Sequence, residues 1–393
     1  MPYLGNEVAP LVQALEGKEL KLDSDGDSSI TADTDDQIDF KVGGSDKLKV
    51  DANSHLVTNT AGTSNLVLGV TAGNSIASGG NYNTLIGDEA GADITTGDNN
   101  TCVGTFSGRE IIASGSNTAV GSYSMYSMTH GENNVAIGTS ALDVDTKGSR
   151  SVAVGRNALG SQNFTSETNA NNTAVGSNAG ELLSTGTANT FVGSATGAGG
   201  TITGNDNTCV GMAAGYSLTS GTNNLLLGHE AGRAGSPTGD FNTGSNTVCL
   251  GDDNIVNIFC ADTSISSSDS RDKADITDFN IGLNWVKDLR PVTYKWDKRS
   301  WYGTDEEPYG TPDGSKKKSK VNIGFLAQEV LEIEKANGFA DSRDTMLTCN
   351  LTDDGQRYGM KYERLVPVLV NAIKELSAKN DALEARIKKL EDG

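Results

Sequence analysis

Aromatic residues are scarce in this sequence, which holds 9 Phe, 10 Tyr and 3 Trp among 393 residues. Because large aromatic side chains fill much of a globular core, their scarcity disfavours one large globular domain. The 5 cysteines are odd in number and widely spaced, so they form neither a disulfide framework nor a metal-ligand pair. We expect reduced, mostly buried thiols. Glycine, in contrast, is abundant, with 48 copies, and the composition therefore favours an extended, repetitive body.

Basic charge and long apolar runs are also lacking. The formal net charge is −20, which disfavours nucleic acid and anionic membranes as partners because their phosphates would repel the chain. No stretch approaches the roughly 18 apolar residues that a membrane span needs. The start, "MPYLGNEVAPLVQALEGKEL", has no basic segment followed by an apolar run. We expect a chain made in a cytosol that stays soluble and does not insert into membranes.

The acidity is distributed unevenly along the chain. Residues 1–267 hold 10 Lys+Arg against 28 Asp+Glu, whereas residues 268–393 hold 21 against 23. The first part also carries 39 of the 48 glycines and no tryptophan. Two physically different objects therefore meet near residue 267.

A short motif recurs through the middle of the chain, as Asn, any residue, a small or apolar residue, Val/Ile/Leu and Gly. Examples are "NTLIG", "NTCVG", "NTAVG" and "NVAIG". The closing glycines are 69, 87, 104, 121, 138, 155, 176, 193, 211, 228 and 251, so the spacing is 17 or 18 with longer steps of 21 and 23. This regularity predicts a repeat architecture with a period near 17.

Each repeat is predicted to be a short strand whose β-branched or aliphatic residue points inward, closed by a glycine that permits a tight turn. One unit has too little apolar surface to be stable, so units must stack and we expect chains to associate as well. Cys102, Cys209 and Cys249 lie in these strands and are interpreted as core thiols. The aliphatic hexad of acyltransferase β-helices is absent, which disfavours that enzymatic alternative.

These units, "NVAIG" and "SVAVG" above all, resemble the repeats of trimeric adhesin heads and of phage tail fibres. The resemblance covers about residues 60–255 and implies three parallel chains in a β-roll or β-prism stalk. The predicted fold is therefore mainly β, a trimeric repetitive β-stalk followed by an α+β domain that ends in a coiled-coil helix.

Other candidate sites in the first 267 residues are weak. His55, His130 and His229 share no common place in the repeat and are interpreted as ordinary surface histidines. Asp23, Asp25 and Asp27 have calcium-loop spacing, but the loop lacks glycine at its sixth position and an acid at its twelfth. We expect a solvated turn there, short strands elsewhere in the first 60 residues, and no metal site. The opening "MPYLGN" resembles phage tail proteins that attach fibres to a virion.

Residues 268–393 have the pattern of a compact α+β domain. "GLNWVKDLRP" has helical spacing and stops at Pro291, "VTYKW" alternates as a strand, and "SKVNIGFLAQEVLEIEKA" passes from strand to helix. The end of the chain predicts a long helix with a coiled coil over 371–391. Its a/d seam contains Asn380, a polar residue that would fix register and strand number. The alternative is one amphipathic helix packed on its own domain.

The stretch "SSSDSRDKADI" stands where the composition changes. A serine attacks a peptide bond only if a base removes its proton, and the last third of the chain has no histidine. Lys273 lies five residues after Ser268 and would serve as base if it were neutral. Arg271 would supply a second positive charge once chains pack, and Asp269 and Asp272 would oppose this unless they are paired or turned away. The alternative is a plain polar linker.

The ordered motifs "SDSRDKADI", "LRPVTYKW", "NIGFLAQEV" and "YERLVPVLVNAIKEL" resemble the C-terminal intramolecular chaperone of phage tail spikes and fibres, a self-cleaving serine peptidase module. The resemblance covers 268–393. It implies Ser268 as nucleophile and Lys273 as general base, with Asp269 and Arg271 in support. It also implies cleavage between Ser267 and Ser268, without a cofactor.

These features together predict a phage tail fibre or receptor-binding protein of the virion tail, assembled in the host cytoplasm. Its expected parts are an attachment region at 1–60, a β-stalk at 61–260, a linker at 261–267 and the self-removing chaperone at 268–393. Its expected partners are two further copies of the chain, a host surface receptor such as a glycan or outer-membrane component, and other tail proteins at the N-terminus. A bacterial trimeric adhesin with the same chaperone is the alternative. A glycan-cleaving spike would need paired carboxylates and aromatic platforms, in which the repeats are poor.

Overall fold

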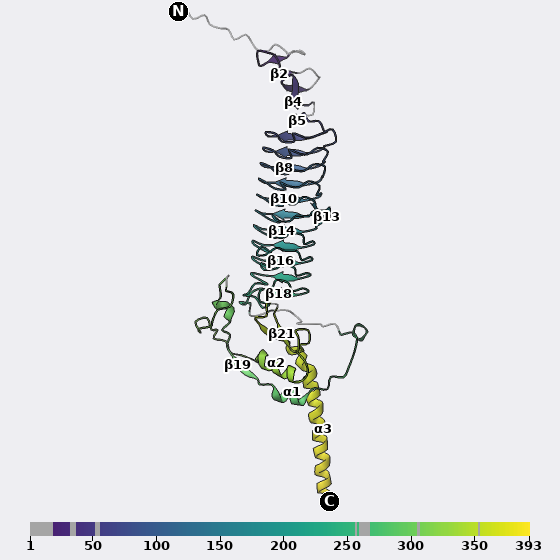
Figure 1. Ribbon diagram of the computed structural model, residues 1–393, viewed down its shortest axis with the longest axis vertical. Helices are drawn as coiled ribbons and strands as arrows, with labels where there is room; N and C mark the ends of the chain where they lie inside the picture. Colours follow the sequence, from purple (N-terminus) through teal and green to yellow (C-terminus); the bar gives the residue numbers. More distant parts are fainter. Residues whose placement is uncertain are drawn as a thin grey trace, which may run out of the picture. The chain divides into compact units, whose positions relative to one another are not determined.

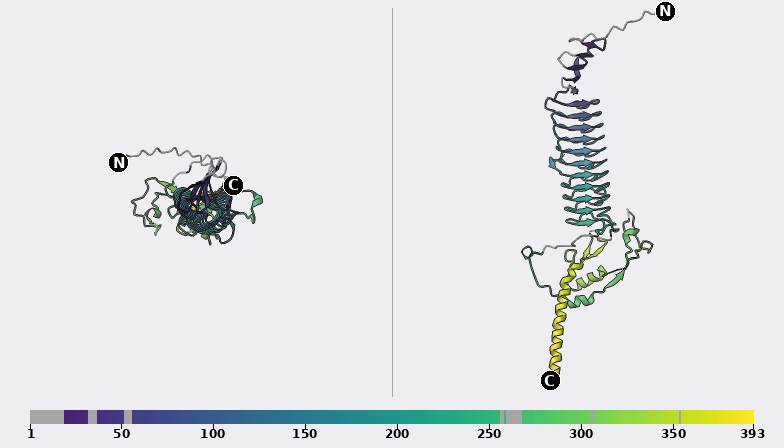
Figure 2. Two further views of the ribbon diagram at one scale, coloured as in Figure 1. Left: turned by 90° about the horizontal axis from the view of Figure 1, so that it is seen from above. Right: turned by 180° about the vertical axis from the view of Figure 1, so that it is seen from behind.

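The computed structural model describes residues 19–31, 37–51, 56–255, 258, 268–304, 307–352 and 354–393. They belong to two compact units, one ending at Val210 and one beginning at Gly211. The predicted mainly β fold is confirmed, because short parallel strands stack one above another as a β-solenoid (Figures 1 and 2). The predicted helix at the end of the chain is present as well.

The first unit opens with a five-stranded antiparallel sheet in sequence order. It consists of β1 (Leu20–Lys21), β2 (Ser29–Thr31), β3 (Ile38–Val42), β4 (Ser45–Val50) and β5 (Leu56–Thr58). The alternating patterns "QIDFKV" and "KLKVD" form β3 and β4, joined by a tight turn at Gly43 and Gly44. The short strands expected in the first 60 residues are therefore confirmed for the residues described.

The motif strands of the first unit pair in parallel and in register, so equivalent residues form columns (Figure 2). These strands are β6 (Leu66–Leu68), β7 (Thr84–Ile86), β8 (Thr101–Val103), β9 (Thr118–Val120), β10 (Val135–Ile137), β12 (Val152–Val154), β14 (Thr173–Val175), β15 (Thr190–Val192) and β16 (Thr208–Val210). A small side sheet pairs β11 (Gly148–Ser149) with β13 (Thr168–Asn169). One chain closes each coil of the solenoid by itself.

The residue that faces inward is the middle one of each three-residue strand. Leu85, Cys102 and Ala119 are fully buried, whereas Ile137 and Val175, which precede the closing glycines, are 41% and 39% exposed. The prediction that the Val, Ile or Leu before the glycine points inward is therefore wrong. In a strand of three residues the first and third share a face, and the Asn before the strand fixes which face that is.

The closing glycine is required by both conformation and space. Gly121 has φ +129°, and a Cβ there would lie 2.7 Å from the carbonyl carbon of Gly138 in the next coil. An L side chain is disfavoured at that φ and would also collide with backbone. The column of glycines thus permits the coils to stack closely at the end of each strand.

The asparagine of the motif forms a buried hydrogen-bonded ladder. Asn117 Nδ2 donates to Gly131 O at 2.9 Å, and its Oδ1 accepts from the backbone N of Asn134 at 3.0 Å. Asn100 makes the equivalent bonds to Ser114 O and to the N of Asn117. Each asparagine side chain therefore donates a hydrogen bond to one backbone carbonyl and accepts one from a backbone amide one coil further on. Both backbone groups lie away from water and need such partners.

The ladder is interrupted at Ser151, which is too short to reach both groups, and the chain compensates. Gln162 is fully buried, donates to Ser151 Oγ at 3.1 Å and accepts from Asn172 Nδ2 at 2.9 Å. It also donates to the buried carboxylate of Asp145, which caps the backbone N of Gly148 at 3.0 Å. The 21-residue repeat thus replaces one asparagine by a small polar network.

Interior volume is balanced within most coils, while next to Ala174 and Gly180 the large Phe191 of the following coil fills the space. A Cβ added at Gly91 would lie 2.7 Å from Leu85, one at Gly108 would lie 2.5 Å from Cys102, and one at Gly197 would lie 2.6 Å from Phe191. Where the strand residue is Ala119, Ala136 or Ala153, the position that corresponds to Gly91 is Met125, Leu142 or Leu159, and all three are fully buried. A large residue at one position therefore accompanies a small one at the other, as dense packing requires.

The second unit contains two further motif strands, β17 (Leu225–Leu227) and β18 (Val248–Leu250), which pair in parallel. The C-terminal module follows. It consists of η1 (Ser270–Asp272), α1 (Leu283–Asp288), β19 (Val292–Tyr294), η2 (Arg299–Tyr302), β20 (Asn322–Gly324), α2 (Ala327–Ala336), β21 (Cys349–Leu351), β22 (Tyr358–Met360), η3 (Tyr362–Arg364) and α3 (Leu365–Glu391). The helices and strands predicted from 282 onward are confirmed, including the stop of α1 before Pro291.

The C-terminal module has a core of Val330, Leu331, Ala340 and Cys349, and polar contacts fix the segments around it. The buried Glu334 of α2 accepts hydrogen bonds from the backbone N of Leu347, Thr348 and Cys349, at 3.0, 2.6 and 3.0 Å, and so anchors β21. The start of α1 packs on α3, where Glu375 Oε1 accepts from the N of Leu283 at 3.3 Å. No helix among the described residues combines the length and apolarity that crossing a membrane requires.

The ladder predicts that Asn117→Ala lowers the free energy of unfolding by about 2 kcal/mol or more. Two buried backbone groups, Gly131 O and the N of Asn134, lose their partners at about 1 to 3 kcal/mol each. The denaturation midpoint followed by circular dichroism measures this. Asn74→Ala is the control, because Asn74 is exposed and lies outside the ladder. Equal midpoints for the two variants would contradict the role of the ladder.

Candidate functional site

The start of the C-terminal module forms a short 3-10 turn that brings Ser268 and Lys273 together. Asp269 caps the turn, since its Oδ1 accepts from the backbone N of Arg271 at 2.9 Å. The backbone then turns through η1, and Lys273 follows it as the C-terminal cap. As a result Lys273 Nζ lies 2.7 Å from Ser268 Oγ and donates a hydrogen bond to it.

The other two charged residues of the turn pair with each other. Arg271 Nη2 lies 2.6 Å from Asp269 Oδ2, and Arg271 Nε lies 3.1 Å from both carboxylate oxygens. The hydrogen bonds from Arg271 lower the pKa of Asp269, and those same bonds raise the pKa of Arg271. Asp269 is therefore paired, as the sequence required. The positive charge of Arg271 is thus paired with the carboxylate of Asp269.

The environment of the pair is open to solvent. Ser268 and Lys273 are both exposed, and the Arg271 side chain is 87% exposed. A lysine acts as a general base only where burial or a neighbouring cation stabilises its neutral amine. In the observed bond the lysine donates, whereas activation of the hydroxyl needs the opposite proton transfer. The single chain thus holds Ser268 and Lys273 within hydrogen-bonding distance but leaves both exposed to solvent.

Ser267, the residue on the other side of the predicted cleavage point, lies outside the described residues. His55 and Cys260 lie outside them too. The four described cysteines form no disulfide and are buried. Burial raises the pKa of the Cys102 and Cys209 thiols to about 12, which keeps them protonated and unreactive. The interpretation as core thiols is confirmed for Cys102, Cys209 and Cys249.

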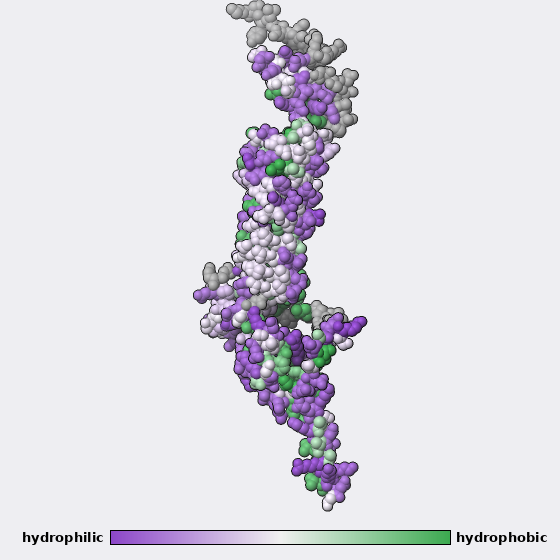
Figure 3. Space-filling model, turned by 45° about the vertical axis from the view of Figure 1, so that its right-hand side comes forward, coloured by the Kyte–Doolittle hydropathy of each residue, from purple (hydrophilic) through white to green (hydrophobic). Residues whose placement is uncertain are grey.

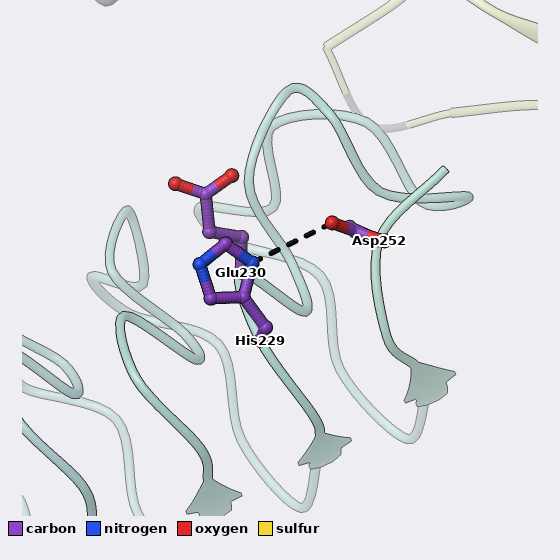
Figure 4. Close-up of side chains that lie close together, drawn as sticks. All are labelled: His229, Glu230 and Asp252. Carbon is purple, nitrogen blue, oxygen red and sulfur yellow. Dashed lines mark ion pairs between the residues drawn. The ribbon is translucent and has the colours of Figure 1, made fainter. Parts of the chain in front are cut away.

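The remaining titratable candidates occupy the solenoid surface. His130 is exposed. His229 is 53% exposed and faces Asp252 across neighbouring coils, with Nδ1 3.5 Å from Oδ2, while Glu230 lies beside it (Figure 4). Burial alone would raise the pKa of Asp252, but hydrogen bonds from Asn254 and His229 lower it. Both described histidines thus lie at the surface, as expected.

The aspartates near the N-terminus form a turn. Asp23, Asp25 and Asp27 bring their carboxylates within 4.8 Å of one another, and all three are exposed. Asp23 Oδ1 accepts from the backbone N of Gly26 at 2.9 Å. Hydrogen bonding from Ser28 lowers the pKa of Asp23 to about 2. The turn is thus stabilised by its own backbone, as a solvated turn would be.

The sequence reading missed an aromatic cluster on the solenoid. Ring centroids of Phe106 and Tyr123 are 4.9 Å apart, and those of Tyr123 and Tyr126 are 5.5 Å apart. Phe106 and Tyr123 occupy the same place in consecutive repeats with φ of 58° and 59°, where bulky residues are disfavoured. Arg109 lies beside Tyr126, at 5.7 Å from its ring centre, and pairs with Glu89 at 2.6 Å. Aligning the repeats at their closing glycines would have placed the two rings together.

The C-terminal helix exposes the predicted a/d seam. Ile373, Leu376, Leu383, Ile387 and Leu390 are 53% to 76% exposed, and both hydrophobic and hydrophilic residues lie on the surface of the helix in Figure 3. Asn380 is exposed as well. Only the first turns of α3 are packed, through Leu365, Val368 and Ala372. The start of α3 thus packs on its own domain, as the alternative has it, whereas the seam from Ile373 onward is exposed, as a coiled coil requires.

Residues 268–339 match the Peptidase S74 family, described as chaperone of endosialidase. The match begins at Ser268, the residue that the turn places beside Lys273. No curated protein and no solved structure matches the chain. A β-solenoid followed by this domain fits a tail fibre or tail spike with a C-terminal chaperone, and the family implies a self-cleaving peptidase activity in general terms.

Proposed function

We propose that the chain is a homotrimeric fibre or receptor-binding protein of a phage tail. Its C-terminal domain drives trimer assembly and then cuts the chain between Ser267 and Ser268. The observation that carries this proposal is the contact of Lys273 Nζ with Ser268 Oγ at 2.7 Å, at the first residue of the family match. Residues 1–60 would attach the fibre to other tail proteins.

The proposed reaction uses the serine that donates its own nitrogen to the cleaved bond. Ser268 Oγ attacks the carbonyl carbon of Ser267, and Lys273 takes the hydroxyl proton. The C–N bond breaks, the proton passes to the nitrogen, and Ser267 is held as an ester on Ser268. Water then hydrolyses this ester and leaves a Ser267 carboxylate and a Ser268 with a free amine and a free hydroxyl. Nucleophile and target belong to adjacent residues, which favours the reaction entropically.

Two features support a link between assembly and cutting. Lys273 is exposed in one chain, so we infer that packing of neighbouring chains covers it and stabilises the neutral amine. Uncovered apolar surface for such packing exists on the α3 seam and on the outside of the solenoid sheet, where Leu68, Ile137 and Val175 are 39% to 43% exposed. Cutting after assembly would leave a stalk that cannot readily unfold and refold.

Cleavage predicts that wild-type protein consists of two pieces, of 267 and 126 residues, which together make 393. Ser268→Ala and Lys273→Ala should each abolish the cut, because one removes the nucleophile and the other the base. Ser270→Ala is the matched control and should cut normally. Intact mass and N-terminal sequencing measure this. A small piece that begins elsewhere than Ser268, or a Ser268→Ala chain that is cut normally, would contradict the assignment.

Trimerisation predicts that uncut Ser268→Ala protein has three times the chain mass of 40.9 kDa by light scattering. Leu376→Asp with Leu383→Asp should give monomers or aggregates, because charges in the seam oppose helix association. Ala382→Asp adds one such charge at an exposed position off the seam and should stay trimeric, whereas Leu383→Asp alone, with one charge in the seam, should weaken the trimer. A wild-type monomer at micromolar concentration would refute the assembly role.

We place the receptor contact at the cluster of Phe106, Tyr123 and Tyr126. Exposed ring faces pack on sugar rings, and neighbouring charged groups bind hydroxyls. Arg109 lies 2.6 Å from Glu89 and 3.5 Å from Asp93, so both signs of charge border the rings. The positive φ at this place belongs to the repeat itself, since Glu89 and Ser140 have it as well, so the aromatic side chains and not the backbone distinguish these two repeats.

This contact predicts that Tyr123→Ala weakens binding to a bacterial surface polysaccharide about tenfold or more, as removal of a central aromatic contact does. A panel of purified lipopolysaccharides and capsular polysaccharides on sensor surfaces measures it. Tyr82→Ala is the control, since Tyr82 is 59% exposed and lies outside the cluster. Equal affinities for the two variants would move the receptor contact elsewhere.

A further inference from the structure

A buried carboxylate joins the last solenoid turns to the C-terminal module. Asp253 follows β18, and its side chain is 4% exposed. Its Oδ1 accepts from Lys298 Nζ at 2.9 Å and from Arg357 Nη1 at 3.2 Å, and its Oδ2 accepts from Ser300 Oγ at 2.5 Å. Arg357 Nη2 also lies 3.0 Å from Oδ2. One carboxylate thus receives two cations and a hydroxyl from η2 and from the β21–β22 hairpin.

Arg357 also contacts the backbone of the solenoid end. Its Nη1 donates to Ser236 O at 2.6 Å, and its Nη2 donates to Ala234 O. Asp253 itself donates its backbone N to Gly235 O at 2.6 Å. The Arg357 guanidinium therefore binds Ser236 O, Ala234 O and the Asp253 carboxylate at the same time. A lysine could not do this, because it lacks the planar, forked set of N–H donors.

A second carboxylate repeats the arrangement in the opposite direction. Asp354 of the module accepts from the backbone N of Asp240 at 3.2 Å and from Tyr309 Oη at 2.5 Å. The solenoid loop approaches closely there, since a Cβ on Gly239 would lie 2.7 Å from Asp354 Oδ2. Gly239 has φ +71°, so both space and conformation favour glycine at this contact.

The order of these residues along the chain determines which contacts a cut between residues 267 and 268 would break. The solenoid side of the contact comes from residues 234–253, which precede Ser268, and the module side comes from residues 298–357, which follow it. Cutting between 267 and 268 therefore breaks none of these bonds. The interface is a contact between what would become two separate polypeptides.

We propose that Asp253 is the centre of a noncovalent latch that keeps the C-terminal piece on the end of the stalk after the chain is cut. This inference rests on the proposed self-cleavage. The latch residues are Asp253, Lys298, Ser300, Asp354 and Arg357. Because the carboxylate is desolvated and fully paired, removing it leaves Lys298 and Arg357 without their counter-charge in a partly buried place. Cleavage and release are then separate events.

The latch also explains how the open end of the solenoid is protected. β18 is the last strand of its sheet, and an uncovered strand edge pairs with other chains. Repeat proteins need an end cap for that reason. A retained C-terminal piece serves as this cap until it is displaced.

The test uses wild-type full-length protein with an affinity tag at its N-terminus. A denaturing gel reports the cut, and washing of the immobilised native protein reports how fast the C-terminal piece leaves. The latch predicts that cut wild-type pieces stay together. Asp253→Asn should be cut as well but lose its C-terminal piece about thirtyfold faster or more, as loss of one member of a buried charge pair does. Arg357→Gln should do the same without altering the stalk.

Asp252→Asn is the matched control, because Asp252 pairs with His229 and not with the module. Cut wild-type pieces that separate as fast as those of Asp253→Asn would overturn the latch, as would Asp253→Asn pieces that stay together. An uncut wild-type chain on the gel would refute the self-cleavage instead. The latch is then tested on Ser268→Ala carrying a protease site between 261 and 267, cut in vitro. Thermal melting of the stalk distinguishes release from misfolding in each variant.

Discussion

The buried asparagine ladder is the interaction on which the rest of the solenoid depends. A coil of about 17 residues with a three-residue strand leaves many backbone groups inside, away from water, and each must find a partner. Asn100 and Asn117 show how one side chain serves two of them, one within its own coil and one in the next. The bonded groups are 14 and 17 residues away from Asn117 but 20 and 23 residues away from Asn224, so the ladder keeps the coils in register while the loop between its members varies in length. Where Ser151 interrupts it, Gln162 and Asp145 supply the missing bonds.

The same stacking rule decides what lies outside. Equivalent residues of successive coils align, so an apolar residue at the end of one strand becomes a column of apolar residues on the outer face, as Ile137 and Val175 show. Inside the solenoid, crowding among the aligned side chains is avoided because a large residue is paired with a small one in the same coil, as Phe191 is with Gly197. Outside, Ile137 and Val175 remain exposed in the part of the chain that the structure describes. A fold that satisfies its own interior thus leaves an apolar column on its surface, of the kind that marks interaction sites.

The sequence predicted what is encoded locally. The glycine spacing shows the period, Pro291 marks the end of α1, and the three- and four-residue spacings from Ile373 onward show the seam of α3. Ser268 and Lys273 are five residues apart, so their proximity follows from one turn. The inward residue of each strand was predicted wrongly, because three residues contain no alternation from which a face can be inferred without knowing where Asn117 and its equivalents bind. The contact of Asp253 with Arg357 spans 104 residues, and no local pattern encodes it.

The chain places its carboxylates in two opposite environments, and this difference separates the steps of its proposed life cycle. Asp269 is paired with Arg271 at the surface, where water and other chains can still rearrange the pair. Asp253 is paired with Lys298 and Arg357 in a nearly closed place, where exchange is costly. The residues near the cut are thus free to respond to assembly, whereas the residues that hold the pieces are not. It follows that assembly would control when the chain is cut, and that the cut by itself would not control when the pieces part.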